Sequence, residues 1–256
     1  MIDLSIQDDV AHVVLDDPSK LNALDEDAIG QLDAAYAEAE ASGVRALVLR
    51  GEGRAFCAGR DISRVDPRDD DVLGYLGGLV TPLLRRMSAF PAPTFAAAHG
   101  ACLGVGLGLL IATDVVYVAE SAKIGSPFAA LGATLDSGGH ALFFERLGAH
   151  KTLDLIFTGR LMTGAEAVQS GLFSQVFPAD DVVAATVAAA HRAATGATGA
   201  FLASKELVRR LRDERLGLWE SVEVENAAQA ALCDSDDYRE GFAAFQQKRT
   251  PQFTGR

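Results

Sequence analysis

Two glycine-marked segments carry the residues whose types and spacing could do chemistry. One runs from Gly53 to Asp61 and the other from His99 to Gly106. Each follows an apolar run that we interpret as a buried strand, and each leads towards a helical stretch. Glycine lets backbone N–H groups approach a ligand closely, and a strand-to-helix turn carries free N–H donors at the positive end of the helix dipole. Two such loops could point two N–H groups at one oxygen atom, which is the design of an oxyanion hole.

Strands separated by helices must position these loops. Residues 2–15 alternate in polarity around Asp8-Asp9, which predicts a β-hairpin. Periodicity and capping residues predict further strands at 44–50, 94–98, 114–119 and 172–177 and helices at 25–41, 72–89, 107–112, 137–147 and 151–157. After residue 180 nearly all of the chain is expected to be helical, with breaks at 196–199, 217 and 235–236. This order indicates an α/β core at residues 1–195 and a helical region for oligomer contacts at residues 196–256.

Composition and charge limit the class of protein. At 256 residues, with 49% hydrophobic and 23% charged residues, the chain is long enough for one large globular domain or two small ones. The net charge of −12 argues against a nucleic-acid binder, which needs a basic face. The first residues enter a strand pattern directly, and the longest apolar run, from Leu103 to Ala112, is short and rich in glycine. We therefore expect neither a signal peptide nor a membrane span.

The cysteines give no sign of a metal site. Cys57, Cys102 and Cys233 are odd in number and lack the spacing of metal ligands. Free thiols of this kind are typical of proteins from a reducing compartment. The sequence therefore predicts a cytoplasmic protein with no bound metal.

Several segments resemble those of one superfamily of enzymes. Residues 54–62, Arg-Ala-Phe-Cys-Ala-Gly-Arg-Asp-Ile, resemble the first signature of the crotonase (enoyl-CoA hydratase/isomerase) superfamily, and residues 100–106 with 112–114 resemble its second. Further matches lie at residues 20–24, 158–160, 165–167, 171–172, 204–205, 240–245 and 248–249. Together the matches cover essentially the whole chain, and their order and spacing carry the resemblance.

The resemblance implies an α/β fold built as a spiral of ββα units with a C-terminal helical region, and trimers that often pair into hexamers. It also implies an acyl-CoA thioester as the partner, with coenzyme A as part of the substrate and no separate cofactor. The backbone N–H groups of Ala58 and Val105 match the family's oxyanion hole, which holds the thioester oxygen as it becomes an enolate. Losing one such donor typically costs about 3–4 kcal/mol.

The same resemblance places other residues at the substrate. They are Lys20, Leu21, Ala55, Arg60, Asp61, Ile62, Gly104 and Phe128, with Phe245 and Lys248 at the coenzyme A group. Because the chain has a net charge of −12, a polyanion such as coenzyme A needs local cations. Lys248 on the last helix would supply one, in its own subunit or across a subunit boundary.

The chain departs from the hydratase pattern at two positions. Hydratases of this superfamily carry two glutamates that handle a water molecule, and these correspond to positions 108 and 128. This chain has Gly108 and Phe128 instead. Neither side chain can accept or donate a proton, so the sequence does not support hydration by paired carboxylates.

Asp136 supplies a carboxylate elsewhere. It lies where some members carry a single Asp or Glu, and those members resemble Δ3,Δ2-enoyl-CoA isomerases and the ring-opening isomerase of phenylacetate breakdown. One base can move a double bond by removing a proton at C2 and returning one at C4, without water. Phe128 beside it could exclude water and raise the pKa of the carboxyl group by desolvation. The favoured function is therefore an enoyl-CoA isomerase with Asp136 as proton shuttle.

Other interpretations of the same residues stay open. Asp136 before a helix is also a good N-cap. It could instead be the nucleophile or water-activating base of a thioester hydrolase or dehalogenase. The chain could also be an enoyl-CoA hydratase, or an acyl-CoA-binding subunit with little activity of its own. His99 and His140 flank the proposed site, where lone histidines are more often structural hydrogen-bonding groups. The run from Gly104 lacks the third glycine of a dinucleotide-binding fingerprint, because position 109 is Leu.

Overall fold

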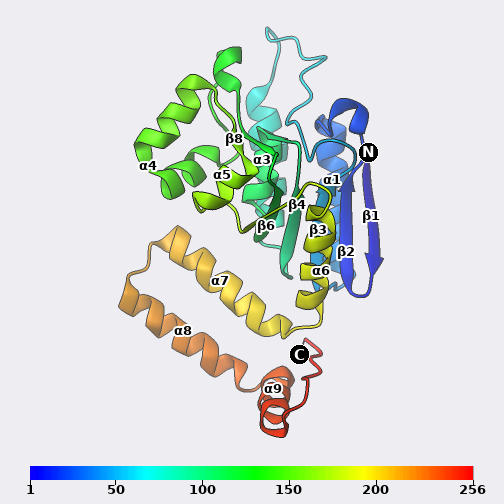
Figure 1. Cartoon of the computed structure of the whole chain (residues 1–256), viewed down its shortest axis with the longest axis vertical. Coiled ribbons are helices and arrows are strands. Elements are labelled where there is room, and N and C mark those ends of the chain that lie inside the picture. The colour runs from blue at the N-terminus through cyan, green and yellow to red at the C-terminus, as the bar shows by residue number, and fades with distance from the viewer. Residues whose placement is uncertain (256) are drawn as a thin grey trace.

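Six strands form the main sheet of the computed structural model, which describes residues 1–255 (Figure 1). In spatial order they are β1 (Ile2–Gln7), β2 (Val10–Leu15), β3 (Ala46–Gly51), β4 (Thr94–Ala98), β6 (Val115–Ala119) and β9 (Gln175–Phe177). The predicted hairpin of β1 and β2 is antiparallel, and the later neighbours are parallel. Strands β3 and β4 are almost completely buried, which explains why they appear in the sequence as continuous apolar runs.

After β4 the chain leaves the main sheet and enters a smaller one. Strand β5 (Ala101–Leu103) pairs in parallel with β7 (Lys123–Gly125), and β7 pairs antiparallel with β8 (Met162–Thr163). A turn at Gly100, with a φ of 55°, separates β4 from β5. A Cβ at this position would overlap the carbonyl oxygen of Arg54, so only glycine fits. This turn brings the second glycine-marked loop against the first.

Helices cover the sheets largely where the sequence predicts them. They are α1 (Glu26–Ala41), α2 (Thr81–Ser88), α3 (Val105–Ile111), α5 (Gly164–Gln169) and α6 (Val182–Ala194). The side chain of Asp25 accepts a hydrogen bond from the N–H of Ala28 at 2.9 Å, which confirms it as the N-cap of α1. Helix α5 begins with a capping box of Thr163 and Glu166. Helix α6 packs against β3 and β4, in front of the main sheet in Figure 1.

The structure corrects the boundaries of two predicted elements. The predicted helix at 72–89 begins as a π-helical turn, η2 (Gly74–Val80), before α2. The two helices predicted at 137–147 and 151–157 are present within α4 (Gly139–Thr158), because non-helical backbone angles at Gly148 divide this element in two. The last strand of the main sheet is shorter than predicted because residues 172–174 precede it as irregular backbone.

Three helices form the C-terminal region and extend away from the sheets (Figure 1). They are α7 (Thr198–Glu214), α8 (Leu218–Leu232) and α9 (Asp236–Gln247), separated at the predicted breaks. Two cations tie this region to the core. The Nζ of Lys205 lies 2.9 Å from the carboxylate of Asp114, and Arg45 donates to the carbonyl oxygens of Gly196 and Phe253. Within residues 1–255, no helix is long and apolar enough to cross a membrane.

Candidate functional site

The two glycine-marked loops lie side by side. The N–H of Phe56 donates to the carbonyl oxygen of His99 at 2.7 Å. The N–H of Cys57 donates to Ala101 at 3.0 Å, and its carbonyl oxygen accepts from Leu103 at 3.0 Å. These bonds form a short parallel ladder that links the loop after β3 to the turn after β4 and to β5. They fix the first loop against the start of α3, where helix N–H donors are free.

The N–H of Ala58 is not available as an oxyanion-hole donor. It donates to the carbonyl oxygen of Leu21 at 3.0 Å. The expectation that Ala58 supplies one of the two donors is therefore wrong in this structure. The physical reason lies in the next residue, Gly59, whose φ of 100° turns the backbone and so changes which N–H groups of the loop face the site.

The N–H groups of Arg60 and Val105 are the free donors at this place. Neither has a hydrogen-bond acceptor within the part of the chain that the structure describes. The neighbours of Arg60 bond to Leu24: the N–H of Leu24 donates to the carbonyl oxygen of Gly59, and the N–H of Asp61 donates to that of Leu24. In this parallel pairing the N–H of Arg60 itself points away from Leu24. A Cβ on Gly59 would lie 3.6 Å from the nitrogen of Val105, which shows how closely the first loop approaches α3. A free N–H at Val105 is compatible with its expected role, and in the first loop the free N–H belongs to Arg60 instead of Ala58.

Phe128 forms an apolar wall over these donors. It begins the 3-10 turn η3 (Phe128–Leu131), and its ring rests on Gly104, where a Cβ would lie 2.8 Å from Cζ. Gly104 has a φ of 54° and immediately precedes Val105. The ring therefore lies beside the start of α3, a contact that the sequence did not predict.

Asp136 lies between η3 and α4 with a half-buried carboxyl group. It does not cap the helix, because the N-cap is Gly138 and no side chain caps it. The Oδ1 atom of Asp136 is buried and has no hydrogen-bond partner within residues 1–255. Burial raises the pKa of this carboxyl group, while the neighbouring Ser137, Arg60 and His140 partly oppose the rise. A carboxyl group with a raised pKa and no structural partner suits proton transfer.

Gly108 faces Ser137 rather than open space. A Cβ at Gly108 would lie 2.5 Å from the Cβ of Ser137 and 3.1 Å from its carbonyl oxygen. A larger side chain at position 108 therefore requires Ser137 to move. The packing of Ser137 against position 108 thus favours glycine there, where the hydratase pattern has a glutamate.

A cation and an aromatic ring complete the wall around Asp136. Arg60 pairs with the carboxylate of Asp70 through two hydrogen bonds of 2.7 and 2.9 Å. Its guanidinium group lies 4.2 Å from the ring centre of Tyr75. Tyr75 is buried, and its hydroxyl donates to the carbonyl oxygen of Leu24 at 3.0 Å. Its pKa is raised chiefly by burial, to which the charge of Asp136 adds.

The remaining expected substrate contacts near this centre have different surroundings. Lys20 and Asp61 form an ion pair at 2.8 Å, and hydrogen bonding to Lys20 holds the pKa of Asp61 below its usual value. Ile62 is exposed and begins the polar loop that runs to η2. Ala55 is buried and its carbonyl oxygen accepts from the side chain of Asn22 at 2.8 Å. Their roles in substrate binding stay predictions.

His99 has a structural hydrogen bond, as its predicted role requires. One ring nitrogen, Nε2, lies 3.0 Å from the carbonyl oxygen of Gly53. The other, Nδ1, is buried without a partner in the described chain. His140 lies on α4 close enough to influence Asp136 electrostatically. The histidine nearer to the carboxylate is therefore His140.

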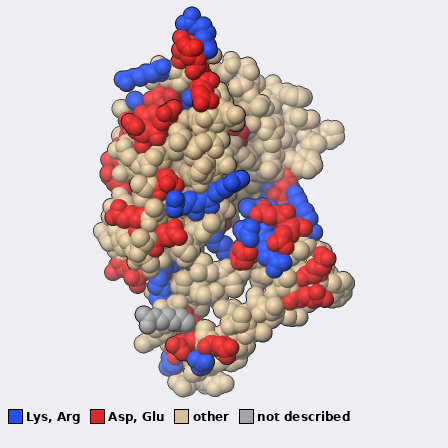
Figure 2. Space-filling model, turned by 180° about the vertical axis from the view of Figure 1, so that it is seen from behind, with Lys and Arg blue, Asp and Glu red and all other residues tan. Residues whose placement is uncertain are grey.

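Phe245 and Lys248 lie at the far end of the molecule. Helix α9 occupies the end opposite to α4 and the polar loop before η2 (Figure 1). The side chain of Phe245 is 85% exposed, and Lys248 ends the helix with a φ of 54°. The structure does not bring these two residues to Asp136 of the same chain. On the face in Figure 2, basic and acidic side chains are interspersed, so a polyanion would have to be held by a local cluster.

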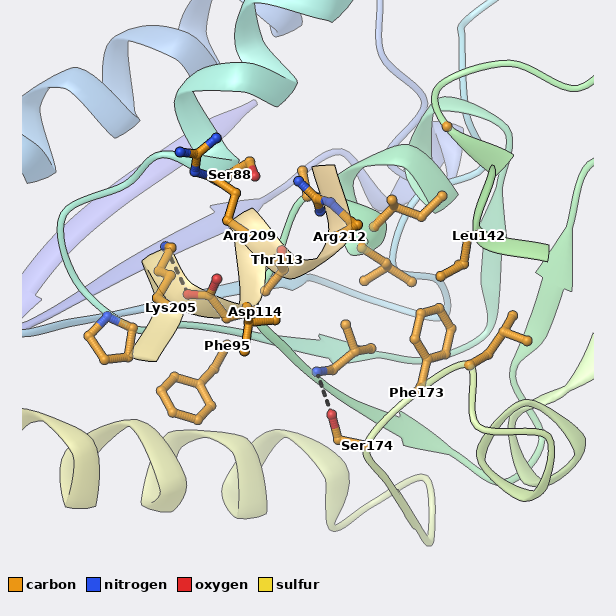
Figure 3. Close-up of a pocket in the computed structure, with 18 of the residues that line it drawn as sticks. Ser88, Phe95, Thr113, Asp114, Leu142, Phe173, Ser174, Lys205, Arg209 and Arg212 are labelled. Carbon is orange, nitrogen blue, oxygen red and sulfur yellow. Dashed lines mark hydrogen bonds and ion pairs between the residues drawn. The ribbon is translucent and has the colours of Figure 1, made fainter. Parts of the chain in front are cut away.

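A cavity of about 1020 Å³ opens on the other side of α3, between α7 and the core. Lys205, Arg209 and Arg212 enter it from α7, and Leu142 and Phe173 line the opposite wall (Figure 3). Its lining includes none of the candidate residues around Asp136. It marks the place where α7 stands away from the sheet, and the sequence did not predict it.

Sequence reasoning missed three residues of the centre. Tyr75, Asp70 and Ser137 had no motif to identify them, because an aromatic residue in a helix, an acid in a polar loop and a serine before a helix are common. Tyr75 and Asp70 reach the site only through the folded path of the loop and η2. The position of Ser137 next to Asp136 is the one signal that the sequence offers.

Comparison with known proteins gives a consistent result. The model of the family "Enoyl-CoA hydratase/isomerase" matches residues 5–256. A crystal structure described as a putative enoyl-CoA hydratase/isomerase from Mycobacterium abscessus has a TM-score of 0.93 and 31% sequence identity, with 100% of both chains covered.

Curated relatives have similar coverage. A probable enoyl-CoA hydratase of Rhizobium meliloti is 35% identical over 251 residues, which is 96% of this chain and 95% of the relative. The 2,3-dehydroadipyl-CoA hydratase of Escherichia coli is 31% identical over 254 residues, 99% of this chain and 98% of the relative. The 1,2-epoxyphenylacetyl-CoA isomerase of the same organism is 30% identical over 256 residues, with 98% and 97% covered.

Proposed function

The chain belongs to the enoyl-CoA hydratase/isomerase family, and from this premise we propose that it is an isomerase that moves a carbon–carbon double bond in an enoyl-CoA thioester. One observation carries the proposal. Asp136 is a half-buried carboxyl group beside free backbone donors, and positions 108 and 128 hold no proton-transferring side chain. A single base is sufficient for a double-bond shift, whereas hydration in this family uses a pair of glutamates.

The proposed reaction begins with proton removal. Asp136 takes a proton from C2 of a 3-enoyl-CoA, and the electrons of the broken C–H bond delocalise onto the thioester oxygen. The N–H groups of Arg60 and Val105 stabilise the charge on that oxygen. Because both donors belong to fixed backbone, they need no rearrangement when the charge develops.

The second step returns the same proton. Protonated Asp136 donates it to C4, the double bond moves from C3–C4 to C2–C3, and the thioester carbonyl re-forms. Atoms and electrons balance without water or a cofactor. Phe128 supports this course because its ring covers Gly104 at the start of α3 and keeps water from the enolate. The raised pKa of Asp136 favours holding the proton between the two steps.

We also propose an oligomer, a trimer or a hexamer, in which α9 supplies the coenzyme A contacts. Phe245 and Lys248 lie away from the Asp136 of their own chain, so a contribution to the coenzyme A site would come from a neighbouring subunit. Large apolar side chains are exposed on the helices that face outward, among them Phe144, Phe157, Leu218 and Trp219. A reducing compartment such as the cytoplasm suits the exposed free thiol of Cys233.

Hydration is the second candidate, because two of the relatives described above are named hydratases. A panel of 3-enoyl-, 2-enoyl- and aryl-CoA thioesters, assayed in parallel for isomerisation and hydration, separates the two. We expect isomerisation of 3-enoyl-CoA, negligible hydration of 2-enoyl-CoA, and a loss of roughly a hundredfold to ten-thousandfold in kcat for Asp136→Asn. Rapid hydration of crotonyl-CoA by the unaltered enzyme would reject the isomerase.

A further inference from the structure

Two adjacent side chains at the centre hold buried oxygen atoms with no partner. The Oδ1 of Asp136 and the Oγ of Ser137 are both buried, and neither forms a hydrogen bond of good geometry within residues 1–255. An ionised carboxylate can only accept hydrogen bonds, whereas a hydroxyl can donate one. Buried polar atoms are normally paired, so two unpaired atoms of complementary type in neighbouring residues require an explanation.

The backbone at Ser137 is in the left-handed region. Its φ is 52°, and that of Gly138 is 89°, so two successive residues turn the chain just before α4 begins. A serine in this region is strained, whereas a glycine would not be. Strained residues held by their surroundings are frequent at functional sites. The feature that serine adds at this position, compared with glycine, is its hydroxymethyl group.

Gly108 holds that group in place. The Cβ of Ser137 would lie 2.5 Å, and its Oγ 3.3 Å, from a Cβ at position 108, so the side chain of Ser137 packs directly on the backbone of α3. The contact leaves Ser137 little room to move away from Asp136. The side chain of Ser137 also lies close enough to the Asp136 carboxyl group for hydrogen bonding between them to oppose the rise in its pKa.

Other polar groups face Asp136 from each element around it. They are Arg60 from the first loop, Tyr75 from η2 and His140 from α4. Arg60 already donates to Asp70, and the hydroxyl of Tyr75 already donates to Leu24. Ser137 is therefore a neutral donor beside Asp136 that has no other partner in the described chain.

This inference rests on the proposed role of Asp136 as the base. We infer that Ser137 is a positioning residue for it: the Ser137 hydroxyl donates a hydrogen bond to Oδ1 of ionised Asp136 and leaves Oδ2 free for the substrate proton. When Asp136 is protonated, its carboxyl group is neutral and the hydrogen bond from the Ser137 hydroxyl is weaker. The bond thus favours the ionised form, and it opposes the effect of burial on this carboxyl group.

Two variants test the inference. Both Ser137→Ala and Ser137→Gly remove the hydroxyl, but only alanine keeps a Cβ in the strained left-handed backbone. The pKa of Asp136 is read by carbon-13 NMR titration of the carboxyl carbons, with Asp136→Asn to assign the signal. We expect both variants to raise this pKa by about one unit, since a hydrogen bond to a charged group is lost. On the acid side of the pH profile, kcat/KM should then fall about tenfold, with a small change on the plateau.

The outcomes separate this inference from the proposed function. An unchanged pKa of Asp136 in both variants would overturn the inference, whether or not the enzyme isomerises enoyl-CoA. A rise in Ser137→Ala alone would also overturn it, because the cause would be backbone strain. If kcat falls by the same factor at every pH and the acid limb of the pH profile of kcat/KM does not move, Ser137 contacts the substrate instead. If the unaltered enzyme has no isomerase activity, the NMR titration still decides the matter.

Discussion

A Cβ on Gly108 would lie 2.5 Å from the Cβ of Ser137, so the two residues fit together only because one of them is glycine. Real Cβ atoms do not approach one another so closely, and the second atom belongs to a residue fixed by a left-handed backbone. The position at which family hydratases carry a glutamate is thus closed by packing here. Placing a glutamate at position 108 without other changes should therefore not create hydratase activity.

Gly108→Glu should therefore fail to create a hydratase. Forcing a larger side chain into a packed site typically costs about 1–3 kcal/mol of stability. We expect a lower Tm and no gain in the hydration of crotonyl-CoA. In the double variant with Ser137→Gly, the clash is relieved and Tm should recover in part. Hydration by the single variant with an unchanged Tm would contradict the packing argument.

Val105→Pro tests the oxyanion hole without disturbing the helix. Val105 is the first residue of α3, a position where proline is well tolerated, but proline has no N–H. Removing one oxyanion donor should lower kcat by about a hundredfold to a thousandfold. Val105→Ala keeps the N–H and is the matched control. Equal activity in the two variants, both folded by circular dichroism, would exclude the Val105 donor.

The stability of Asp136→Asn should depend on pH. Burial raises the folded-state pKa of Asp136 above 3.8, so the folded state binds this proton more tightly than the unfolded state. The stability that this gives is complete below about pH 3.8 and is lost as pH rises through the folded pKa. Asparagine does not ionise and avoids the loss, so its Tm should match the parent in acid and exceed it at pH 7.

Asp61→Asn is the matched control for that experiment. The pKa of Asp61 is lowered because Lys20 is hydrogen-bonded to its carboxylate. The stability from this pair is present above the unfolded pKa and is lost as pH falls. Differential scanning calorimetry across pH should therefore show the opposite sign, with the asparagine variant less stable than the parent at pH 7 and equal in acid.

Asp70→Asn should shift the pH profile of catalysis. The carboxylate of Asp70 pairs with Arg60 and offsets its charge, and Arg60 lowers the pKa of Asp136. Without the carboxylate of Asp70, the attraction of Arg60 for ionised Asp136 increases. We expect the acid limb of kcat/KM to move to lower pH, and the shift to shrink in high salt. Asp66→Asn removes an exposed acid from the same loop, where it pairs with Arg68, and should leave the limb in place.

Most of the fold could be predicted because its signals are local. The N-cap at Asp25, the capping box at Thr163 and the helix breaks of the C-terminal region each depend on a few neighbouring residues. The π-helical turn at η2 was missed. Such turns are rare, and helical periodicity alone does not indicate where one occurs.

The site was predicted in its loops and missed in its details. The glycines and the position of Asp136 follow from sequence, whereas the packing of Phe128 over Gly104 does not. Which N–H groups are free does not follow. Ala58 and Arg60 differ only because the backbone turns at Gly59 and Leu21 supplies an acceptor. Such pairings across the fold leave no local mark in the sequence.

Lys248 provides the test of assembly, because its helix α9 lies at the end of the molecule opposite to α4, which begins just after Asp136 (Figure 1). Lys248→Glu should raise the KM for coenzyme A thioesters strongly and leave the fold intact, since the residue is exposed and ends its helix. Sedimentation should show a trimer or a hexamer for the parent and for this variant. Monomers at micromolar concentration would contradict an interface between subunits.

Mixing two impaired variants decides whether Lys248 acts across that interface. Subunits with Lys248→Glu keep Asp136, and subunits with Asp136→Asn keep Lys248. If each site combines Asp136 of one subunit with Lys248 of its neighbour, random mixing at equal amounts leaves about a quarter of the sites with both residues intact. Activity at subsaturating substrate should then return after the oligomers are dissociated and reassembled together, but not when they are mixed without dissociation. If both residues serve the same chain, no mixed oligomer contains a complete site, and reassembly restores nothing.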